Sequence, residues 1–327
     1  MTTAPTTPAQ PIRPAIEVIK PGALSTFQDL GRAGYQQLGV PANGVMDERA
    51  HRLANALVGN PQDTATLEIT LMGPTLRFGM ATAVAVCGAD LDASIDGTPL
   101  PIAQACVVPA GATLSFGKRK SGLRAYLAVA GGFALHPVMG SDSTFVRGGY
   151  GGMQGKPLRK ADVIGLRAPR AGLPDAPAQP SFAAGVMAAP EAPLRVVRGR
   201  EWDAFSADAH AAFTSAKFRI GAQSDRMGYR LEGPALALSA PREMWSEAVA
   251  FGTVQVPPDG QPIVLMADRQ TTGGYPKIAH VCAVDLPRLA QRMPGESVRF
   301  TVVGLDEAQR LAQLQDTAFA ALERDHG

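Results

Sequence analysis

The sequence contains little cysteine. Three cysteines occur among 327 residues, Cys87, Cys106 and Cys282, and no two of them have the spacing of a metal-binding or redox motif. Cys87 and Cys106 lie in apolar segments, where a buried, reduced thiol is the expected state. This use of cysteine favours a reducing compartment, and we expect a cytoplasmic protein without disulfides.

Charge is also scarce, and it is balanced. Charged residues make up 18% of the chain, and its formal net charge is +2. A nearly neutral protein has no general electrostatic attraction to nucleic acid or to an anionic membrane. No apolar run is long enough to span a bilayer. Residues 1–16 lack the apolar core of a secretory signal, and we expect them to form a disordered tail.

Glycine and proline are abundant, with 35 and 27 residues, and they are spread along the whole chain. Short apolar runs lie between them, for example at 83–86, 126–129 and 263–266. Apolar runs of this length, bounded by turn residues, are typical of strands in a barrel or sandwich. The sequence therefore predicts a mostly β protein with few helices.

The clearest helix is predicted directly after Asp47. Aspartate is a favourable N-cap residue, and Gly59 followed closely by Pro61 is a typical helix end. Shorter helices are predicted at 201–213 and 285–293. A last helix is expected to close the chain over residues 305–327.

Two parts of the sequence resemble each other, which indicates an internal duplication. Residues 29–41 and 224–234 both contain an Asp and an Arg before a Gly-Tyr pair, followed by Leu, Gly and Pro. Further matches follow in the same order: Glu68 with Glu247, Gly73 with Gly252, and Ala89-Asp90 with Ala267-Asp268.

The duplication predicts two related β lobes, over residues 17–170 and 194–304. The segment 171–193 is dominated by alanine, proline and glycine without periodicity, so we expect it to link the lobes.

The densest group of polar residues follows the apolar run 263–266. Asp268 could take or give a proton, and Arg269 or Lys277 could hold a carboxylate. Hydrogen bonds to an oxyanion could come from Gln270 and Thr271. The alternative is a tight hairpin, in which Asp268 and Thr271 only satisfy backbone groups.

The repeated Asp and Arg residues form a second group of candidates. Asp29 and Arg32 in the first lobe correspond to Asp225 and Arg226 in the second. One active site rarely needs two symmetric copies, so a structural role is favoured, with an Asp–Arg pair locking a loop in each lobe. Glu247 is a further candidate, because Gln255 and a Pro-Pro-Asp-Gly turn lie close to it in the sequence.

The glycine-rich stretch 148–155 could hold a phosphate through its backbone N–H groups. It lacks the Lys-Ser/Thr ending of a P-loop, and a flexible loop is the favoured interpretation. The five histidines are scattered, and none has metal-ligand spacing. We therefore expect no metal site.

The motifs described above resemble those of one known family. Residues 28–35 (QDLGRAGY), 223–231 (QSDRMGYRL) and 267–276 (ADRQTTGGYP) look like the allophanate hydrolase subunit 2, or biotin-dependent carboxyltransferase, family. The resemblance covers approximately residues 17–303. It implies two cyclophilin-like β-barrel lobes.

Stand-alone members of this family resemble the C subunit of a bacterial 5-oxoprolinase. The resemblance therefore implies a role in the ATP-dependent cleavage of 5-oxoproline to glutamate. It also implies two partners, the A subunit and the kinase-inhibitor-like B subunit of that enzyme, with ATP shared between the chains.

On this interpretation Arg269 or Arg226 would hold the substrate carboxylate, and Asp268 would handle the lactam proton. The substrate pocket would be lined by Gln270, Thr271 and Tyr275, with Lys277, Glu247 and Gln255 as further binding residues.

Two other functions remain open at the level of the sequence. The chain could be the carboxyltransferase subunit of a urea-type carboxylase, although it has no biotin-carrier Met-Lys-Met sequence and so carries no covalent biotin. It could also be a regulatory module without chemistry, an antagonist of a kinase inhibitor.

Overall fold

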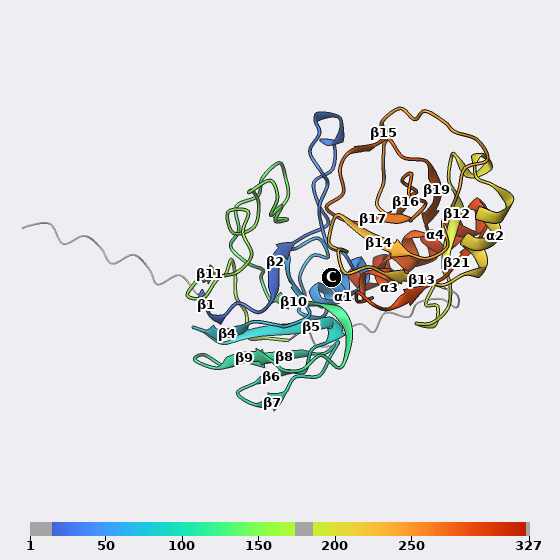
Figure 1. Ribbon diagram of the computed structural model, residues 1–327. Helices are drawn as coiled ribbons and strands as arrows, with labels where there is room; N and C mark the ends of the chain where they lie inside the picture. The colour runs from blue at the N-terminus through green and yellow to red at the C-terminus, as the bar shows by residue number, and fades with distance from the viewer. Residues whose placement is uncertain (1–14, 174–185, 325–327) are drawn as a thin grey trace, which may run out of the picture.

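The computed structural model describes residues 15–173 and 186–324. Two lobes, both mostly β, lie side by side (Figure 1). Most of the predicted tail and the central part of the predicted linker lie outside the described residues. Strand β1 (Ala15–Lys20) begins inside the segment assigned to the tail, so that assignment was too long by two residues. The strand begins earlier than expected because the side chain of Ile16 is fully buried in the core of the first lobe.

The first lobe consists of two sheets that face each other. The six-stranded sheet has the order β11-β1-β4-β9-β6-β7, and the five-stranded sheet has the order β2-β3-β10-β5-β8. Their inner faces enclose a core to which Val18, Phe27, Leu67 and Phe78 contribute. The other strands of this lobe are β2 (Leu24–Gln28), β3 (Thr66–Thr70), β4 (Thr75–Phe78), β5 (Thr82–Asp90), β6 (Ala93–Ile95), β7 (Thr98–Pro99), β8 (Ala105–Val108), β9 (Thr113–Phe116), β10 (Ser121–Val129) and β11 (Val163–Gly165).

Helix α1 (Glu48–Leu57) covers the outer face of the five-stranded sheet. As predicted, Asp47 is its N-cap and accepts a hydrogen bond from the Ala50 N–H. Strand β5 is buried on both faces: Val84 and Val86 face the other sheet, whereas the smaller Ala83 and Ala85 face α1. This double burial explains why β5 is a continuous apolar run, and the small side chains let the helix approach the sheet closely.

The second lobe is an eight-stranded sheet with the order β20-β13-β14-β17-β16-β19-β12-β21. Only Arg299 separates β20 from β21, so the two edges of the sheet meet and the barrel nearly closes. A small sheet of β15 and β18 lies beside it. The strands are β12 (Leu194–Arg198), β13 (Phe218–Ile220), β14 (Gly228–Glu232), β15 (Glu247–Ala248), β16 (Thr253–Gln255), β17 (Ile263–Leu265), β18 (Thr272–Gly273), β19 (Lys277–Val281), β20 (Ser297–Val298) and β21 (Phe300–Val302).

Among the described residues, the remaining α-helices lie in the C-terminal half, whereas one of the three 3₁₀ turns lies in the first lobe. These helices are α2 (Ala207–Ser215), α3 (Leu286–Ala290) and α4 (Leu305–Arg324), with 3₁₀ turns η1 (Gln36–Leu38), η2 (Trp202–Ala204) and η3 (Ala283–Asp285). Helix α4 returns to the first lobe, where Phe319 and Leu322 contact Ala56 of α1. The predicted helices are therefore present, with the one at 201–213 divided into η2 and α2. The last three residues of the predicted closing helix, 325–327, lie outside the described residues.

The two lobes share a buried boundary. Met46, which precedes α1, is 1% exposed and belongs to the core of the second lobe, together with Phe218 and Val264. A side chain of one lobe thus completes the core of the other.

The paired blocks that suggested a duplication differ in local structure. Tyr35 precedes the turn η1, whereas its counterpart Tyr229 lies in strand β14. Glu68 is buried within β3, whereas Glu247 lies in the two-residue strand β15 and is partly exposed. These two pairs therefore differ in local structure, and the equivalence of the two lobes stays a prediction.

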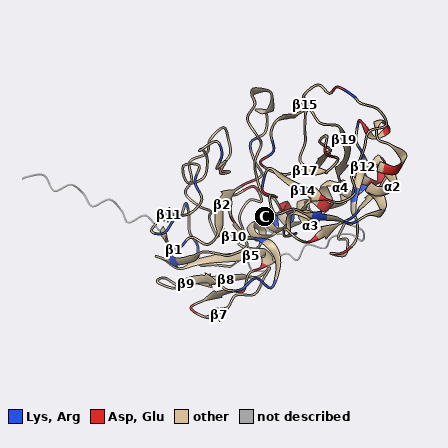
Figure 2. Ribbon diagram, viewed as in Figure 1, with Lys and Arg blue, Asp and Glu red and all other residues tan. Residues whose placement is uncertain are grey.

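Charged residues of both signs are interspersed over both lobes (Figure 2). No helix in residues 15–173 and 186–324 combines the length and apolar character that crossing a membrane requires. All three cysteines are free thiols. Burial raises the pKa of the Cys282 thiol to about 11, so this side chain stays protonated at neutral pH.

Candidate functional site

Arg226 lies at the centre of a polar network buried between the lobes. Its Nε and Nη2 atoms donate to the two carboxylate oxygens of Asp268, at 2.9 and 3.1 Å. Its Nη1 atom donates to Glu68 of the first lobe, and Nη2 also donates to the Gly44 carbonyl at 2.6 Å. Burial opposes the charge of Arg226, but the carboxylates of Asp268 and Glu68 outweigh it, so the pKa is raised. Arg226 therefore stays charged and joins the lobes.

Glu68 is the acidic residue on the first-lobe side of this network. Its Oε2 atom accepts hydrogen bonds from the Tyr126 hydroxyl at 2.8 Å and from the Met46 N–H at 2.9 Å. Arg124 lies 3.8 Å from Oε1 and donates to the Tyr229 hydroxyl of the second lobe at 2.6 Å. Sequence analysis missed Arg124 and Tyr126, although a cation inside the apolar run of β10 signals a buried carboxylate nearby.

Asp268 connects Arg226 to the loop after β2. Asn43 donates from Nδ2 to Asp268 Oδ1 at 2.7 Å, and its own Oδ1 accepts from Arg32. With Arg226 on both oxygens, Asp268 is already an acceptor of three hydrogen bonds. The structure therefore gives Asp268 a structural contact across the lobe boundary, which the hairpin alternative did not foresee.

Asp29 locks two loops of the first lobe together. Its carboxylate accepts from the Ser141 hydroxyl at 2.6 Å, the Ser143 hydroxyl at 2.5 Å and the Asp142 N–H at 2.6 Å. Arg32 donates to the Ser143 carbonyl at 2.5 Å. Asp29 and Arg32 thus act on the same loop, not on each other.

In the second lobe, Asp225 accepts from the N–H groups of Met227 and Gly228, at 2.8 and 3.2 Å, and so closes a turn. Its neighbour Arg226 points to Asp268 and Glu68 instead. The expectation of one Asp–Arg pair in each lobe is therefore wrong. Arginine side chains are long enough to find carboxylates far away in the sequence, and a short motif cannot specify them.

A pocket of about 250 Å³ opens beside this network, between the lobes. Gln36 closes one side by donating to the backbone carbonyls of Val249 and Thr271, at 3.1 and 2.9 Å. Of the predicted site residues, Arg32, Arg269, Gln270 and Thr271 line this pocket. Arg32 belongs to the first lobe and the other three residues to the second, so they are far apart in the sequence.

Arg32 and Arg269 are the cations that line this pocket, and neither has an ion-pair partner in the described part of the chain. Arg32 is bonded to Asn43 and to the Ser143 carbonyl, whereas Arg269 has few hydrogen bonds. The Nη1 atom of Arg269 reaches the Met266 carbonyl at 3.4 Å, and its Nε atom is buried without a hydrogen bond. Within the described residues, no carboxylate lies within 4.0 Å of it. Burial lowers its pKa, although nearby Asp268 opposes this effect. A partly buried, unpaired guanidinium beside a pocket is suited to bind an anion.

The other predicted residues lie near the far end of the loop that carries Arg269, which strands β15, β16 and β19 surround. Lys277 is buried, with its Nζ atom 3.4 Å from Glu247 and 4.0 Å from Glu201. Gln255 is 1% exposed, and its Nε2 atom has no partner among the described residues. The side chain of Tyr275 is exposed. Lys277, Glu247, Gln255 and Tyr275 do not line the pocket between the lobes.

In the described part of the chain, no three His, Cys, Asp or Glu side chains are grouped so that they could hold a metal ion. The polar side chains that line the pocket between the lobes are the guanidinium groups of Arg32 and Arg269, the amides of Gln36 and Gln270, and the Thr271 hydroxyl. These can bind and orient an anionic or amide-containing molecule.

Comparison with known proteins assigns this architecture to a family. Residues 38–302 match the family described as carboxyltransferase domain, subdomain A and B. The chain is 37% identical to the C subunit of 5-oxoprolinase from Escherichia coli over 307 residues, which cover 94% of this chain and 97% of that protein.

Urea-processing enzymes are also similar. The chain is 31% identical to urea amidolyase of Saccharomyces cerevisiae, over 94% of this chain but 18% of the enzyme. The crystal structure of K. lactis urea amidolyase superposes with a TM-score of 0.87 at 30% identity, covering 96% of this chain and 20% of that one. The fold expected from the sequence motifs is thereby confirmed.

Proposed function

The chain belongs to the carboxyltransferase family with subdomains A and B, and on this basis we propose that it is the C subunit of an ATP-dependent 5-oxoprolinase. In this proposal it acts with the A and B subunits to open the lactam of 5-oxoproline and form glutamate. Support comes from the E. coli relative, which is named as the C subunit of 5-oxoprolinase and which the chain matches over nearly its whole length.

The observation that carries the proposal at the level of the site is the unpaired Arg269. The substrate 5-oxoproline has a carboxylate, and a guanidinium binds a carboxylate through two parallel hydrogen bonds. Arg269 in the pocket between the lobes would hold this group. Gln270 and Thr271 would then hydrogen-bond to the lactam.

Asp268 has a different role in this proposal from the one expected from the sequence. Its oxygens already accept three hydrogen bonds from Arg226 and Asn43. We therefore assign it as a positioning residue that fixes the start of the loop carrying Arg269. Lys277, paired with Glu247 and Glu201, fixes the other end of the loop.

The nucleotide is assigned to a partner chain of the complex. An unstrained lactam is a poor electrophile, and ATP would supply a phosphoryl group that makes the carbonyl oxygen a better leaving group. The pocket of about 250 Å³ is smaller than the sites of drug-sized ligands, roughly 300–1,000 Å³. Its lining contains two cations, Arg32 and Arg269, and Arg32 is bonded to Asn43 and the Ser143 carbonyl. The pocket suits the lactam better than a triphosphate.

The main alternative is a carboxyltransferase subunit of a urea-type carboxylase, which the S. cerevisiae urea amidolyase relative favours. Urea has no carboxylate, so it gives Arg269 no charged partner. Binding of 5-oxoproline and of urea to the purified chain therefore separates the two functions.

The test compares the unchanged chain with Arg269→Gln. We expect calorimetry to detect 5-oxoproline binding, and Arg269→Gln to weaken it about 10-fold or more, the worth of a charge-assisted contact. Arg242→Gln, which changes an exposed arginine of the same lobe, is the matched control and should bind normally.

A second measurement addresses the reaction. The chain mixed with its A and B subunits should form glutamate in an ATP-dependent manner, and Arg269→Gln should raise the KM for 5-oxoproline. Binding of urea but not 5-oxoproline, with no glutamate formed, would establish the alternative. Binding of neither, together with inhibition of a kinase inhibitor, would favour the regulatory role.

A further inference from the structure

A second pocket, of about 370 Å³, lies wholly within the first lobe. Its walls come from residues 134–136, from the end of the glycine-rich stretch at 152–159, and from 162–165 at strand β11. It shares no lining residue with the pocket between the lobes. The function proposed above makes no use of it.

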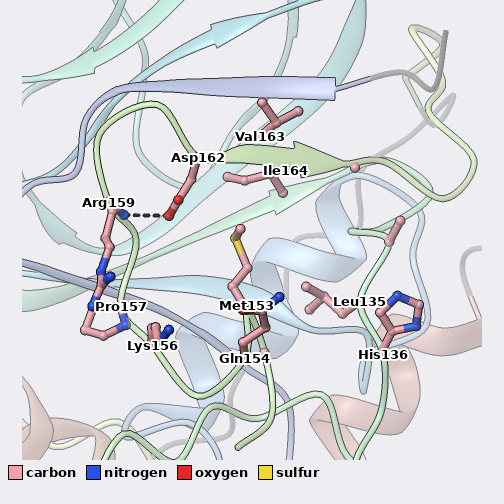
Figure 3. Close-up of a pocket in the computed structure, with 13 residues that line it drawn as sticks. Leu135, His136, Met153, Gln154, Lys156, Pro157, Arg159, Asp162, Val163 and Ile164 are labelled. Atoms are coloured by element: carbon pink, nitrogen blue, oxygen red, sulfur yellow. Dashed lines mark hydrogen bonds between the residues drawn. The ribbon is translucent and has the colours of Figure 1, made fainter. Parts of the chain in front are cut away.

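The centre of this pocket is apolar, and its rim is basic. Figure 3 shows Met153 at the centre, between Ile164 on one side and Leu135 on the other. Lys156 and Arg159 lie together at one side of the pocket. His136 lies at the opposite side (Figure 3).

The two cations have no carboxylate partner. Within residues 15–173 and 186–324, no acidic oxygen lies within 4.0 Å of the side-chain nitrogens of Lys156 or Arg159. The pocket contains one acidic residue, Asp162, and its Oδ2 atom accepts the backbone N–H of Arg159 at 2.6 Å. Both cations are exposed to solvent, and their donors are free to bind an anion.

A third pocket, of about 380 Å³, is also lined by cations, and two of them are paired. Among its arginines, Arg288 is bound to Asp285 at 3.1 Å and to four backbone carbonyls. Arg292 in the same pocket lies 3.2 Å from Glu191 and 3.6 Å from Glu296. These two arginines are neutralised by carboxylates of the protein. Lys217 and Arg299, which also line the third pocket, have no ion-pair partner among the described residues, as is the case for Lys156 and Arg159.

The glycine-rich wall is held in place by close packing. A Cβ atom at Gly152 would lie 2.0 Å from Thr144 Oγ1, and one at Gly155 would lie 2.0 Å from the Gly149 carbonyl carbon. Both glycines have positive φ, at 51° and 71°. The backbone therefore approaches its neighbours where only glycine fits. The expectation of a flexible loop at 148–155 is replaced by a packed wall.

We propose that this pocket is a second ligand site, which binds a small amphipathic anion. The ligand has an apolar body of a few carbon atoms, which contacts Met153, Ile164 and Leu135. It ends in a carboxylate or a phosphate, which binds Lys156 and Arg159. The site is independent of the proposed 5-oxoproline site.

The test is calorimetric titration of the full chain with probes that separate the two properties of the ligand. Hexanoate and hexyl phosphate have the apolar body with each type of anion. Hexan-1-ol has the body alone, acetate has the charge alone, and hexylamine has the opposite charge. We expect saturable binding of one or both amphipathic anions, and binding of the three other probes at least about 10-fold weaker, because each lacks the charge-assisted contact or the buried body.

Variants locate the binding. The double variant Lys156→Gln/Arg159→Gln should weaken it about 10-fold or more, because both charge-assisted contacts are lost. Lys160→Gln, an exposed neighbouring lysine outside the pocket, is the matched control and should bind within about 2-fold of the unchanged chain. Met153→Glu, which places a carboxylate at the apolar centre, should also block binding.

Three results would overturn the proposal. The first is that neither amphipathic anion binds saturably. The second is that Lys160→Gln weakens binding as much as the double variant, which would indicate attraction to the general surface. The third is that Arg269→Gln abolishes binding, because the anion would then occupy the pocket between the lobes. Loss of 5-oxoproline binding alone would leave this site unaffected.

Discussion

Both carboxylate oxygens of Asp268 accept hydrogen bonds from the guanidinium of Arg226, and Arg226 also bonds Glu68 of the opposite lobe. The three side chains belong to residues that are each at most 7% exposed. The contact between the lobes removes these charges from water. Arg226 compensates the two carboxylates, and Asn43 and Tyr126 donate further hydrogen bonds to them. The boundary is thus a specific polar contact as well as an apolar one.

This contact makes Asp268→Asn a test of stability. The change should lower the free energy of unfolding by about 3 kcal/mol, the lower end for breaking a buried pair, because Glu68 still compensates Arg226. Urea unfolding measures the effect. Asp225→Asn, at an exposed aspartate that closes a turn, is the control and should cost less than about 1 kcal/mol.

Turnover of the reconstituted complex then decides between positioning and proton transfer. If Asp268 only positions the loop, activity per folded molecule should change little. A variant as stable as the unchanged protein but about 100-fold slower would mean that Asp268 moves a proton. The assignment as a positioning residue would then be wrong.

Asp29→Asn should lower the melting temperature without loss of activity per folded molecule. The amide has one oxygen in place of two, while the hydroxyls of Ser141 and Ser143 and the Asp142 N–H all donate to this side chain. The unsatisfied donors should cost about 1–3 kcal/mol. Differential scanning calorimetry measures the change, with the exposed Asp63→Asn of a neighbouring loop as control. A stable but inactive Asp29→Asn would place the active site in the first lobe.

Met46→Ala tests the apolar part of the lobe boundary. Met46 is 1% exposed within the core of the second lobe, and truncation should leave a cavity there. The expected loss in the free energy of unfolding is about 2–5 kcal/mol, measured by urea denaturation. Met72→Ala removes a methionine that is 58% exposed and should be nearly neutral. Equal effects of the two changes would contradict the assigned role of Met46.

His51 should make stability depend on pH. The ring is fully buried and bonds Thr66 Oγ1 at 2.9 Å, and burial lowers its pKa to about 3 from the ordinary value of 6.5. Between these values the unfolded chain binds a proton that the folded chain excludes. The stability due to neutral His51 is therefore complete above about pH 6.5 and falls as the pH is lowered, by at most about 1.4 kcal/mol per pH unit.

Urea unfolding at several pH values checks this slope. His51→Gln removes the titrating group, so the slope below about pH 6.5 should become shallower. His136→Gln, at a histidine on the surface of the same lobe, should retain the slope of the unchanged protein. If His51→Gln has no effect on the slope, the protonation of His51 does not limit stability in acid.

Local sequence patterns determined much of this protein. Short apolar runs between glycines and prolines indicated a mostly β fold, and Asp47 with Gly59 marked the ends of α1. Both signals act over a few residues, through hydrogen bonds and allowed backbone angles that neighbours in the chain control. The family motifs at 28–35, 223–231 and 267–276 are likewise contiguous, so the sequence carried them in full.

The tertiary structure alone decided which charged groups meet. Arg226 is adjacent to Asp225 in the sequence, yet it bonds Asp268, 42 residues away, and Glu68, 158 residues away. Arg269 follows Asp268 directly, but it is left unpaired because Arg226 occupies that carboxylate. The strength of an ion pair depends on the distance between the charges and on their burial. Both are set by how the strands of the two lobes pack together in the folded chain. For this reason the residue types of the site were visible in the sequence, whereas their partners were not.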